Sequence, residues 1–237
     1  PPIQSDEAPA PFLRPLLPVH VTPASLVLPG RFRAAVFDMD GLLLDSEPLW
    51  NDAERELLER HGDSFSDADK EASHGRALAE TAAAYAQRLG LPADAIEREI
   101  GEIMLAHYVA GAPLHAGARE LVDALAGRVG LAVASNTAAA LVRQALDAVG
   151  LSALGVVVSG QELGQPKPAP DVYLAACRAL GVAPADAIAF EDSPMGVQSA
   201  LAAGLFVVGV PERPDVDLAA AGAHVVLASL VDVIVEG

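Results

Sequence analysis

The chain is poor in several residue types, and each scarcity excludes a class of protein. Its 237 residues include a single cysteine, Cys177, so no internal disulfide can form. Cys177 lies in an apolar helical stripe, which favours a core position over a reactive thiol. A lone cysteine is compatible with a reducing compartment, and we expect a cytoplasmic protein. No apolar run reaches the ~18 residues of a membrane-spanning helix, because Asp232 interrupts the most apolar tract.

Basic residues are equally scarce. Lys and Arg number 15 against 32 Asp and Glu, which gives a formal net charge of −17. Nucleic-acid binding requires a basic footprint, and an anionic membrane surface repels an acidic chain. We therefore expect neither nucleic acid nor membrane as a partner. The sequence leaves the oligomeric state open, and a monomer is compatible with it.

The prolines are unevenly spread. The first thirty residues hold eight of the chain's 18 prolines and show no sustained hydrophobic period. They also lack the basic start and the uninterrupted apolar centre of a secretory signal. We predict an irregular Pro-rich extension over residues 1–30 that takes no part in the chemistry.

Six short runs follow that are apolar throughout, as expected of strands covered on both faces. They are RAAVFD (33–38), GLAVAS (130–135), GVVVS (155–159), AIAFED (187–192), FVVGV (206–210) and HVVLAS (224–229). Amphipathic helical patterns separate most of them, and those over 138–150 and 171–181 both end in the glycine that commonly follows a helix. Strands that alternate with helices predict an α/β fold with a doubly wound parallel sheet.

One connection is too long for a crossover. Roughly ninety residues separate Asp38 from Leu131, whereas a parallel crossover needs about a dozen. The pattern between them is helical. We therefore predict a small helical cap domain, residues 51–114, inserted into an α/β core domain made of residues 31–50 and 115–237. The insertion adjoins the carboxyl end of the first strand, where ligands bind in open α/β sheets.

The first strand ends in two carboxylates. Asp38 and Asp40 stand one residue apart, so in an extended strand both side chains face the same way. Like charges this close resist ionising together unless a cation or a lysine compensates them. Taken alone, the pair followed by Gly41 is also compatible with a solvated turn.

Matching polar residues follow the other strands. They are Ser135 and Asn136 after the second run, Lys167 in a proline-rich loop after the third, and Glu191 and Asp192 after the fourth. The carboxyl ends of parallel strands meet at one edge of the sheet. Several carboxylates in a small volume favour Mg²⁺, and a lysine beside a hydroxyl favours a phosphate. The sequence thus predicts a phosphoryl group facing the two aspartates of the first strand.

In this arrangement the sequence resembles the haloacid dehalogenase superfamily of aspartyl-phosphate-forming hydrolases. Four motifs of that superfamily occur in order: DMDGLLLDSE (38–47), SNT (135–137), KPAPD (167–171) and EDSPMGVQSALAAG (191–204). The resemblance covers residues 34–229, including the position of the small cap. DSEPLW and EDSPMG make the chain similar to the sugar-phosphate phosphatase and β-phosphoglucomutase group. The resemblance implies Mg²⁺-dependent hydrolysis of a small phosphorylated metabolite.

The resemblance also implies roles for the carboxylates. Asp38 would be the nucleophile that attacks phosphorus, giving an acyl phosphate that water then hydrolyses. Asp40 would protonate the leaving oxygen and later deprotonate the water. Mg²⁺ would be held by Asp38, the main-chain carbonyl of Asp40 and Asp192, with Glu191 acting through water.

The other matching residues would contact the substrate. Ser135, Asn136 and Lys167 would bind the transferring phosphoryl oxygens, and Lys167 would also offset the repulsion between the acids. The cap offers three candidate substrate contacts: Trp50, Gly75 and Arg76. Filling the junction between the domains is the alternative for Trp50, and an exposed loop position is the alternative for Arg76. The cap chooses the substrate in this group, so the sequence does not identify it.

A mutase on the same scaffold is the main alternative to a phosphatase. The mutases carry a histidine twelve positions after the nucleophile, where this chain has Trp50. The Trp50 indole donates through one nitrogen and cannot titrate, so we expect Asp40 to be free to activate water as soon as the leaving group departs. A phosphonate-cleaving relative would need a cap lysine, and the candidate, Lys70, lies in a charged run that indicates solvated surface. A non-catalytic binding module is a further alternative, although no motif carboxylate is missing.

Overall fold

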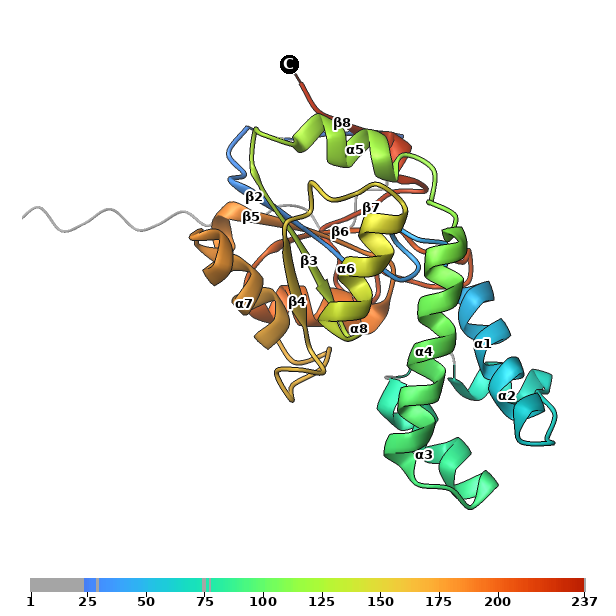
Figure 1. The fold of residues 1–237 in the computed structure, drawn as a ribbon. Helices are drawn as coiled ribbons and strands as arrows, with labels where there is room; N and C mark the ends of the chain where they lie inside the picture. The colour runs from blue at the N-terminus through green and yellow to red at the C-terminus, as the bar shows by residue number, and fades with distance from the viewer. Residues whose placement is uncertain (1–23, 29, 74–75, 77, 237) are drawn as a thin grey trace, which may run out of the picture.

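A six-stranded sheet, parallel throughout, forms the centre of the computed structural model, which describes residues 24–28, 30–73, 76 and 78–236 (Figure 1). The strand order is β4-β3-β2-β5-β6-β7. The strands are β2 (Ala34–Phe37), β3 (Gly130–Ser135), β4 (Val156–Ser159), β5 (Ala187–Glu191), β6 (Phe206–Gly209) and β7 (Val225–Val226). Each of them lies within one of the six apolar runs.

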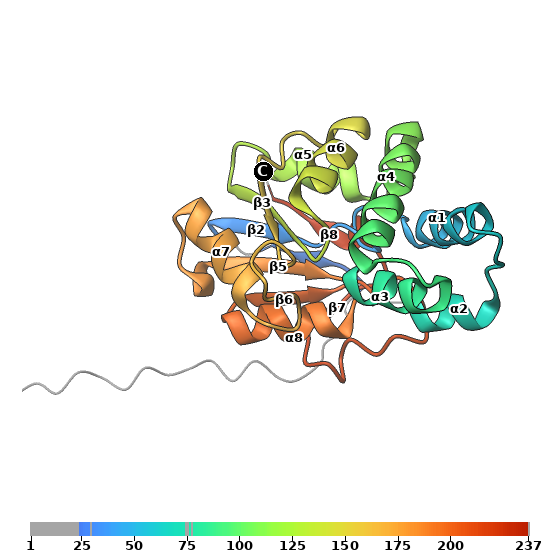
Figure 2. The ribbon, with the colours of Figure 1, turned by 60° about the horizontal axis from the view of Figure 1, so that its bottom comes forward.

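Helices cover both faces of this sheet (Figure 2). Helices α5 (Ala118–Leu125) and α6 (Ala139–Ala148) lie on one side, and α7 (Asp171–Leu180) and α8 (Pro194–Ala203) lie on the other. Along β2, Ala34 and Val36 pack toward α7 and α8, whereas Ala35 and Phe37 pack into the opposite cluster. Side chains that alternate between two dry layers explain why the strands are apolar at every position. The predicted doubly wound α/β fold is confirmed.

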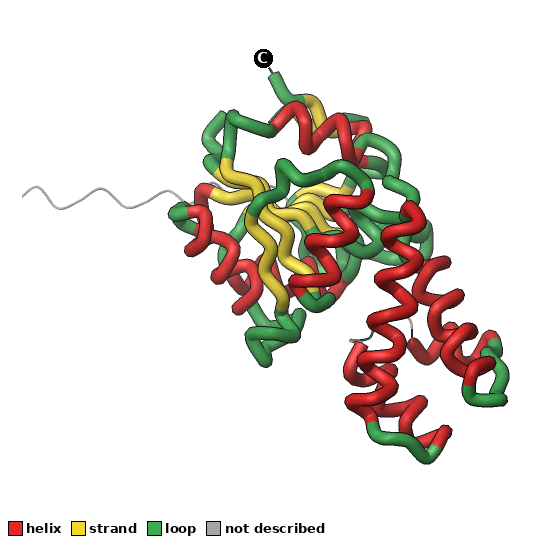
Figure 3. Tube along the Cα trace, in the orientation of Figure 1, coloured by secondary structure: helices red, strands yellow, loops and turns green. Residues whose placement is uncertain are grey.

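The chain between β2 and α5 forms a separate helical lobe beside the sheet (Figures 1 and 3). Its helices are α1 (Glu47–Arg60), α2 (Asp67–Ser73), α3 (Leu78–Leu89) and α4 (Ala93–Gly111). We call these four helices the cap. The predicted cap insertion is confirmed as part of the fold. The domain boundaries at residues 51 and 114 stay a prediction, and α1 begins four residues before the first of them.

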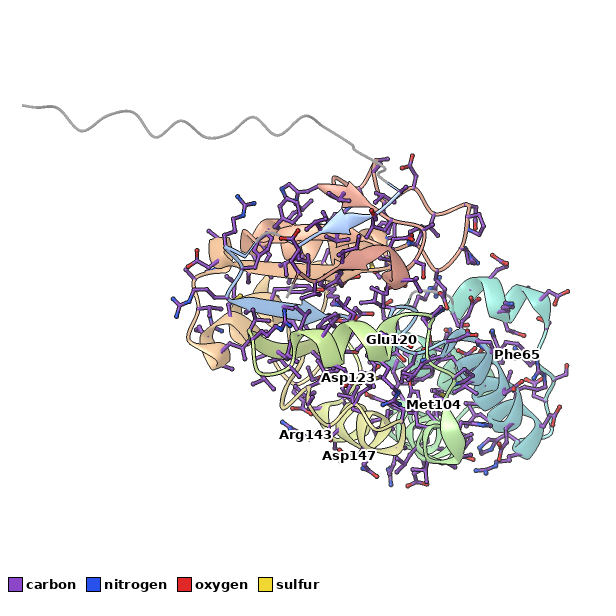
Figure 4. The ribbon with its side chains drawn as sticks, turned by 90° about the horizontal axis from the view of Figure 1, so that it is seen from above. Phe65, Met104, Glu120, Asp123, Arg143 and Asp147 are labelled. Carbon is purple, nitrogen blue, oxygen red and sulfur yellow. The ribbon has the colours of Figure 1, made fainter. Side chains whose placement is uncertain are left out.

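Apolar stripes hold the cap together and seat it on the core. Leu57 and Leu58 of α1 and Ile100 of α4 are fully buried in one cluster with residues of β2. Met104, also fully buried, lies where α4 passes α6 (Figure 4). Burying each such side chain stabilises the fold by about 1.5–3 kcal/mol. The outer faces of α5 and α6 instead carry exposed charges, which Figure 4 labels: Glu120, Asp123, Arg143 and Asp147.

The two crossings between cap and core run side by side. Leu44 and Leu114 form an antiparallel bridge. The Asp45 amide donates to the Pro113 carbonyl at 2.9 Å, and the His115 amide donates to the Leu43 carbonyl at 2.9 Å. Because the first crossing starts a few residues after β2, the cap is held directly above the carboxyl edge of the sheet.

A second, two-stranded sheet corrects one prediction. Strand β1 (Leu26–Val27) pairs in parallel with β8 (Val233–Ile234) near the other end of the chain. The expectation of irregular structure through residue 30 is wrong for these two residues, because so short a strand gives no periodic signal. Residues 1–23 and 29 lie outside the described residues. Over residues 24–28, 30–73 and 78–236, no helix is both long and apolar enough to cross a membrane.

Candidate active site

A cavity of about 220 Å³ opens between the carboxyl edge of the sheet and the cap. Its core wall includes most of the predicted motif residues: Asp38, Asp40, Ser135, Asn136, Lys167 and Asp192. Its cap wall includes Trp50, Glu54, Lys70 and Arg76. Residues from four strand ends and three cap segments therefore meet in one place.

Lys167 links two of the strand ends. Its Nζ donates to Asp38 Oδ1 at 2.6 Å and to Glu191 Oε1 at 2.5 Å, and its side chain is 5% exposed. Burial alone would lower the pKa of Lys167, but the two carboxylates outweigh burial and hold that pKa above its usual value. Burial raises the pKa of Asp38 to about 7; Lys167 opposes this rise, and repulsion from Glu191 and Asp40 adds to it. Lys167 is thus the cation that compensates the charges of Asp38 and Glu191.

Glu191 is fully buried behind Lys167. Its carboxylate also accepts hydrogen bonds from the Tyr173 hydroxyl and, at 3.2 Å, from Ser193 Oγ. A Cβ at Gly196 would lie 1.9 Å from this carboxylate, so only glycine fits there. With three donors around it, Glu191 is placed to anchor Lys167, which leaves it less suited to direct metal binding than Asp192.

The carboxylates fit a divalent cation. Ligand oxygens of Asp38, Glu191 and Asp192 lie within 4.8 Å of one another. Among the described residues, no donor reaches the buried Oδ1 of Asp192. Burial, together with repulsion from Asp38 and Glu191, raises the pKa of Asp192 well above its usual value. An orphaned buried oxygen beside other carboxylates is a donor set that suits a hard divalent cation.

Gly41 lies against this cluster. A Cβ there would meet Asp192 Oδ2 at 2.5 Å, and the φ of Gly41 is +80°. Both the close approach and the left-handed backbone require glycine. Gly41 therefore leaves room for the carboxylate of Asp192, the residue that follows β5.

Asp40 is held from both lobes. Its Oδ1 accepts hydrogen bonds from Ser46 Oγ at 2.8 Å, from Trp50 Nε1 at 3.4 Å and from the Tyr108 hydroxyl at 2.5 Å. Its Oδ2 accepts one from Thr137 Oγ1 at 2.9 Å. Tyr108 of α4 is a cap-linked partner of Asp40 that the sequence does not reveal, in addition to Trp50. Burial and the neighbouring Asp40 charge raise the pKa of Tyr108 well above its usual value, so its hydroxyl acts as a donor.

Ser135 and Asn136 line the cavity at the end of β3. Ser135 Oγ accepts from the Thr137 amide at 3.0 Å, which leaves the hydroxyl proton for an anion in the cavity. Asn136 Oδ1 accepts from the Lys167 amide at 2.8 Å. Asn136 thereby fixes the loop that carries Lys167, a contact that the sequence does not reveal.

The cap candidates have different outcomes. Trp50 and Arg76 both line the cavity, whereas Gly75 lies outside the described residues. Lys70 also lines the cavity, with its Nζ 3.8 Å from Glu47 Oε1, and its side chain is 45% exposed, as expected for a lysine in a solvated charged run. The charged run around it folds as α2, whose described residues include none that is buried.

Glu54 is a cavity residue that sequence reasoning missed. It is 4% exposed, and its Oε2 accepts from the Tyr85 hydroxyl of α3 at 2.7 Å. Burial raises the pKa of Glu54, and the hydrogen bonds from Tyr85 and Ser73 oppose the rise. Glu54 follows Trp50 by four residues on α1, so both lie on one helix face. That spacing is the signal that could have found it.

Comparison with known proteins decides the family. The model of the haloacid dehalogenase-like hydrolase family matches residues 32–204. The chain belongs to this family. Validoxylamine A 7'-phosphate phosphatase of Streptomyces hygroscopicus subsp. limoneus is 34% identical to this hydrolase, over 85% of this chain and 96% of the relative. Fructose-1-phosphate phosphatase YqaB of Escherichia coli (strain K12) is 32% identical, over 76% of this chain and 97% of the relative.

Comparison with solved structures indicates the same family for this hydrolase. CbbY from Rhodobacter sphaeroides in complex with phosphate superposes with a TM-score of 0.76 at 29% identity, over 84% of this chain and 95% of that one. A putative β-phosphoglucomutase from Thermotoga maritima gives 0.70 at 28% identity, with the same coverage. The predicted family and the prediction of an enzyme are confirmed, and the phosphatases among the relatives support a phosphoric monoester hydrolase.

Proposed function

We propose that this hydrolase is a Mg²⁺-dependent phosphatase that cleaves small phosphomonoesters, sugar phosphates among them, through a phosphorylated Asp38. The observation that carries the proposal is the position of Lys167, whose ammonium bridges Asp38 and Glu191 at the floor of the cavity. A buried cation beside a nucleophile and an orphaned carboxylate oxygen suits a phosphoryl group bound next to a metal. The named relatives act on phosphorylated small metabolites, and the scarcity of cysteine favours the cytoplasm.

In the first step, an Asp38 carboxylate oxygen attacks phosphorus while the bond from phosphorus to the alcohol oxygen breaks. Asp40 donates its proton to that oxygen, so a neutral alcohol leaves. Asp38 must be ionised for the attack, and Lys167 favours the ionised form. Ser135, Asn136 and Lys167 bind the phosphoryl oxygens and hold the group in line.

In the second step, water attacks phosphorus of the acyl phosphate. Asp40, now a carboxylate, takes the proton of the water, and the bond between phosphorus and Asp38 breaks. Inorganic phosphate is released, Asp38 returns as a carboxylate and Asp40 returns protonated. One residue thus serves as acid and then as base.

Asp38, Asp192 and the main-chain carbonyl of Asp40 would hold Mg²⁺, with Glu191 acting through water. When bound, the cation neutralises charge on the carboxylates and on the phosphoryl oxygens. Trp50, Gly75 and Arg76 remain our candidates for substrate contact in the cap. We add Glu54, a buried hydrogen-bond acceptor suited to a substrate hydroxyl.

The test is hydrolysis of a panel of phosphorylated metabolites, with Mg²⁺ and after exhaustive chelation. We expect phosphate release that requires the metal and that Asp38→Asn lowers by at least ~10³-fold. Full activity after chelation would contradict the metal assignment. No release from any member of the panel would favour the remote alternative, a non-catalytic binding module.

A β-phosphoglucomutase-type mutase is the second candidate, and the cap-linked partners of Asp40 are the observation that favours it. A mutase must keep water from the phosphorylated Asp38 until a sugar hydroxyl arrives. Neither Trp50 nor Tyr108 can act as a base in this setting, because each only donates to Asp40. We therefore expect β-glucose 1-phosphate with trace bisphosphate to give inorganic phosphate faster than isomerised sugar phosphate. Quantitative ³¹P NMR separates the two outcomes.

A further inference from the structure

We propose that Tyr108 is a positioning residue that orients the Asp40 carboxyl for proton transfer, so that the cap supplies part of the acid–base machinery. The inference rests on the proposed function and deepens it. Tyr108 lies on α4, 68 residues from Asp40 in the chain, and is fully buried. Its hydroxyl donates to Asp40 Oδ1.

The two oxygens of Asp40 are not equivalent. Among the described residues, Oδ1 accepts from three groups, Ser46, Trp50 and Tyr108, whereas Oδ2 accepts from Thr137 alone. A carboxylate oxygen offers about two lone-pair positions, so the donors around Oδ1 leave it no free position. The remaining position on Oδ2 is the one that can carry the transferable proton. The geometry points to Oδ2 as the reacting oxygen of Asp40.

Tyr108 is the strongest candidate among the three donors to Oδ1. Its ring is fully buried, whereas Trp50 is only partly buried and donates at 3.4 Å, and Ser46 lies on the crossing before α1. The ring is fixed by a long helix whose buried residues, among them Ile100 and Met104, pack in the same cluster. A donor on a rigid helix holds the carboxyl in one rotamer.

Removal of the Tyr108 hydroxyl should therefore slow proton transfer from Asp40 to the leaving alcohol oxygen more than the other steps. An alkyl or sugar alkoxide is a poor leaving group and needs the proton of Asp40, whereas p-nitrophenolate leaves without it. A disordered Asp40 would slow the cleavage of alcohol phosphates and spare p-nitrophenyl phosphate. Because kcat/KM reports the steps up to the first irreversible one, it isolates formation of phosphorylated Asp38 from its later hydrolysis.

The experiment compares kcat/KM of wild type and Tyr108→Phe on two substrates, p-nitrophenyl phosphate and fructose 1-phosphate or glycerol 3-phosphate, whichever the wild type cleaves faster. We expect about a tenfold or greater loss on the alcohol phosphate and about a twofold or smaller loss on p-nitrophenyl phosphate. The matched control is Tyr173→Phe. Tyr173 is an equally buried tyrosine that donates to Glu191 and not to Asp40, so its loss should lower both values by the same factor.

Each outcome either supports or overturns the positioning role of Tyr108. A selective loss in Tyr108→Phe with an even loss in Tyr173→Phe supports the positioning role. An equal loss on both substrates in Tyr108→Phe, or no loss on either, overturns it and leaves the proposed function standing. A wild-type protein that cleaves neither substrate nor any other phosphomonoester overturns the proposed function and this inference together. The thermal midpoint of each variant shows whether its fold is intact.

Discussion

Phe37 of β2 stacks on Phe190 of β5, with ring centroids 5.0 Å apart and planes at 10° to each other. The two are register partners, and each is followed at once by a residue of the site, Asp38 or Glu191. The Asp38 amide donates to the Phe190 carbonyl at 3.0 Å. The stack therefore fixes the register that brings the nucleophile and the anchor of Lys167 side by side.

Removing one ring of this stack should cost both stability and activity. Both rings are fully buried, so Phe190→Ala should lower the free energy of unfolding by about 3–5 kcal/mol. Phe190→Leu keeps most of the volume and should cost less. Urea unfolding followed by circular dichroism gives both values. A loss under about 1 kcal/mol for Phe190→Ala would show that the stack does not hold these strands together.

The metal-free protein should lose stability as the pH rises. Burial raises the pKa of Asp38, and also that of Glu212, to about 7 in the folded state. A carboxyl with a raised folded pKa contributes stability below its unfolded pKa, and that contribution is lost as the pH rises through the folded value. For these two groups the free energy of unfolding falls between about pH 4 and pH 7.

The control for this prediction is Asp38→Asn, which removes one of the two titrating groups. Its free energy of unfolding should fall less steeply than that of the wild type over the same range. Mg²⁺ should raise the wild-type thermal midpoint more at pH 7.5 than at pH 5.5, because protons compete with the cation for Asp38 and Asp192. Equal shifts at both pH values would contradict a metal bound by these carboxylates.

Asp192 and Lys167 should differ in their effect on the metal requirement. Asp192 has the orphaned oxygen, so Asp192→Asn should raise the Mg²⁺ concentration for half-maximal activity by at least about tenfold. Lys167→Arg keeps the positive charge and should lower turnover with a smaller change in that concentration. Ca²⁺ should inhibit, because its looser coordination tolerates unproductive geometry. If Lys167→Arg raised this Mg²⁺ concentration more than Asp192→Asn did, the metal-binding role would belong to Lys167 and the phosphate-binding role to Asp192.

Glu54 should contribute to substrate choice. Its buried carboxylate lines the cap side of the cavity and is held by Tyr85, so Glu54→Gln keeps the shape and weakens the acceptor. We expect kcat/KM for hydroxyl-rich sugar phosphates to fall by about tenfold, as for a lost hydrogen bond to a charged group, and that for p-nitrophenyl phosphate to change little. A uniform fall for all substrates would indicate a structural role in the cap.

Most of the core of the site can be predicted from the sequence because its carboxylates and its serine stand at the ends of apolar runs. Asp38, Ser135 and Asp192 end consecutive or adjacent strands, and a parallel sheet brings such ends together whatever the details of packing. Lys167 stands out for a different reason, since the chain has only one other lysine. Topology alone therefore predicts these neighbours.

The residues that the cap contributes to the site cannot be predicted from the sequence in the same way. Tyr108 continues the buried stripe of Ile100 and Met104 on α4, and its spacing gives the same signal for a packed ring as for a hydroxyl that reaches the site. Its partner Asp40 is far away in sequence, so only the docking of cap on core reveals the contact. The pairing of β1 with β8 escapes for the same reason, because neither two-residue strand has a pattern of its own.

The central claim is that Asp38 carries the phosphoryl group and that Asp40 is needed to remove it. Asp40→Asn cannot supply a base for the second step, but p-nitrophenolate needs no acid to leave in the first. Rapid mixing of this variant with p-nitrophenyl phosphate should therefore release about one nitrophenolate per active site in a burst, with phosphate trapped covalently on Asp38 and detectable by peptide mass spectrometry. Absence of the burst, or a phosphate adduct on any residue other than Asp38, would contradict the account.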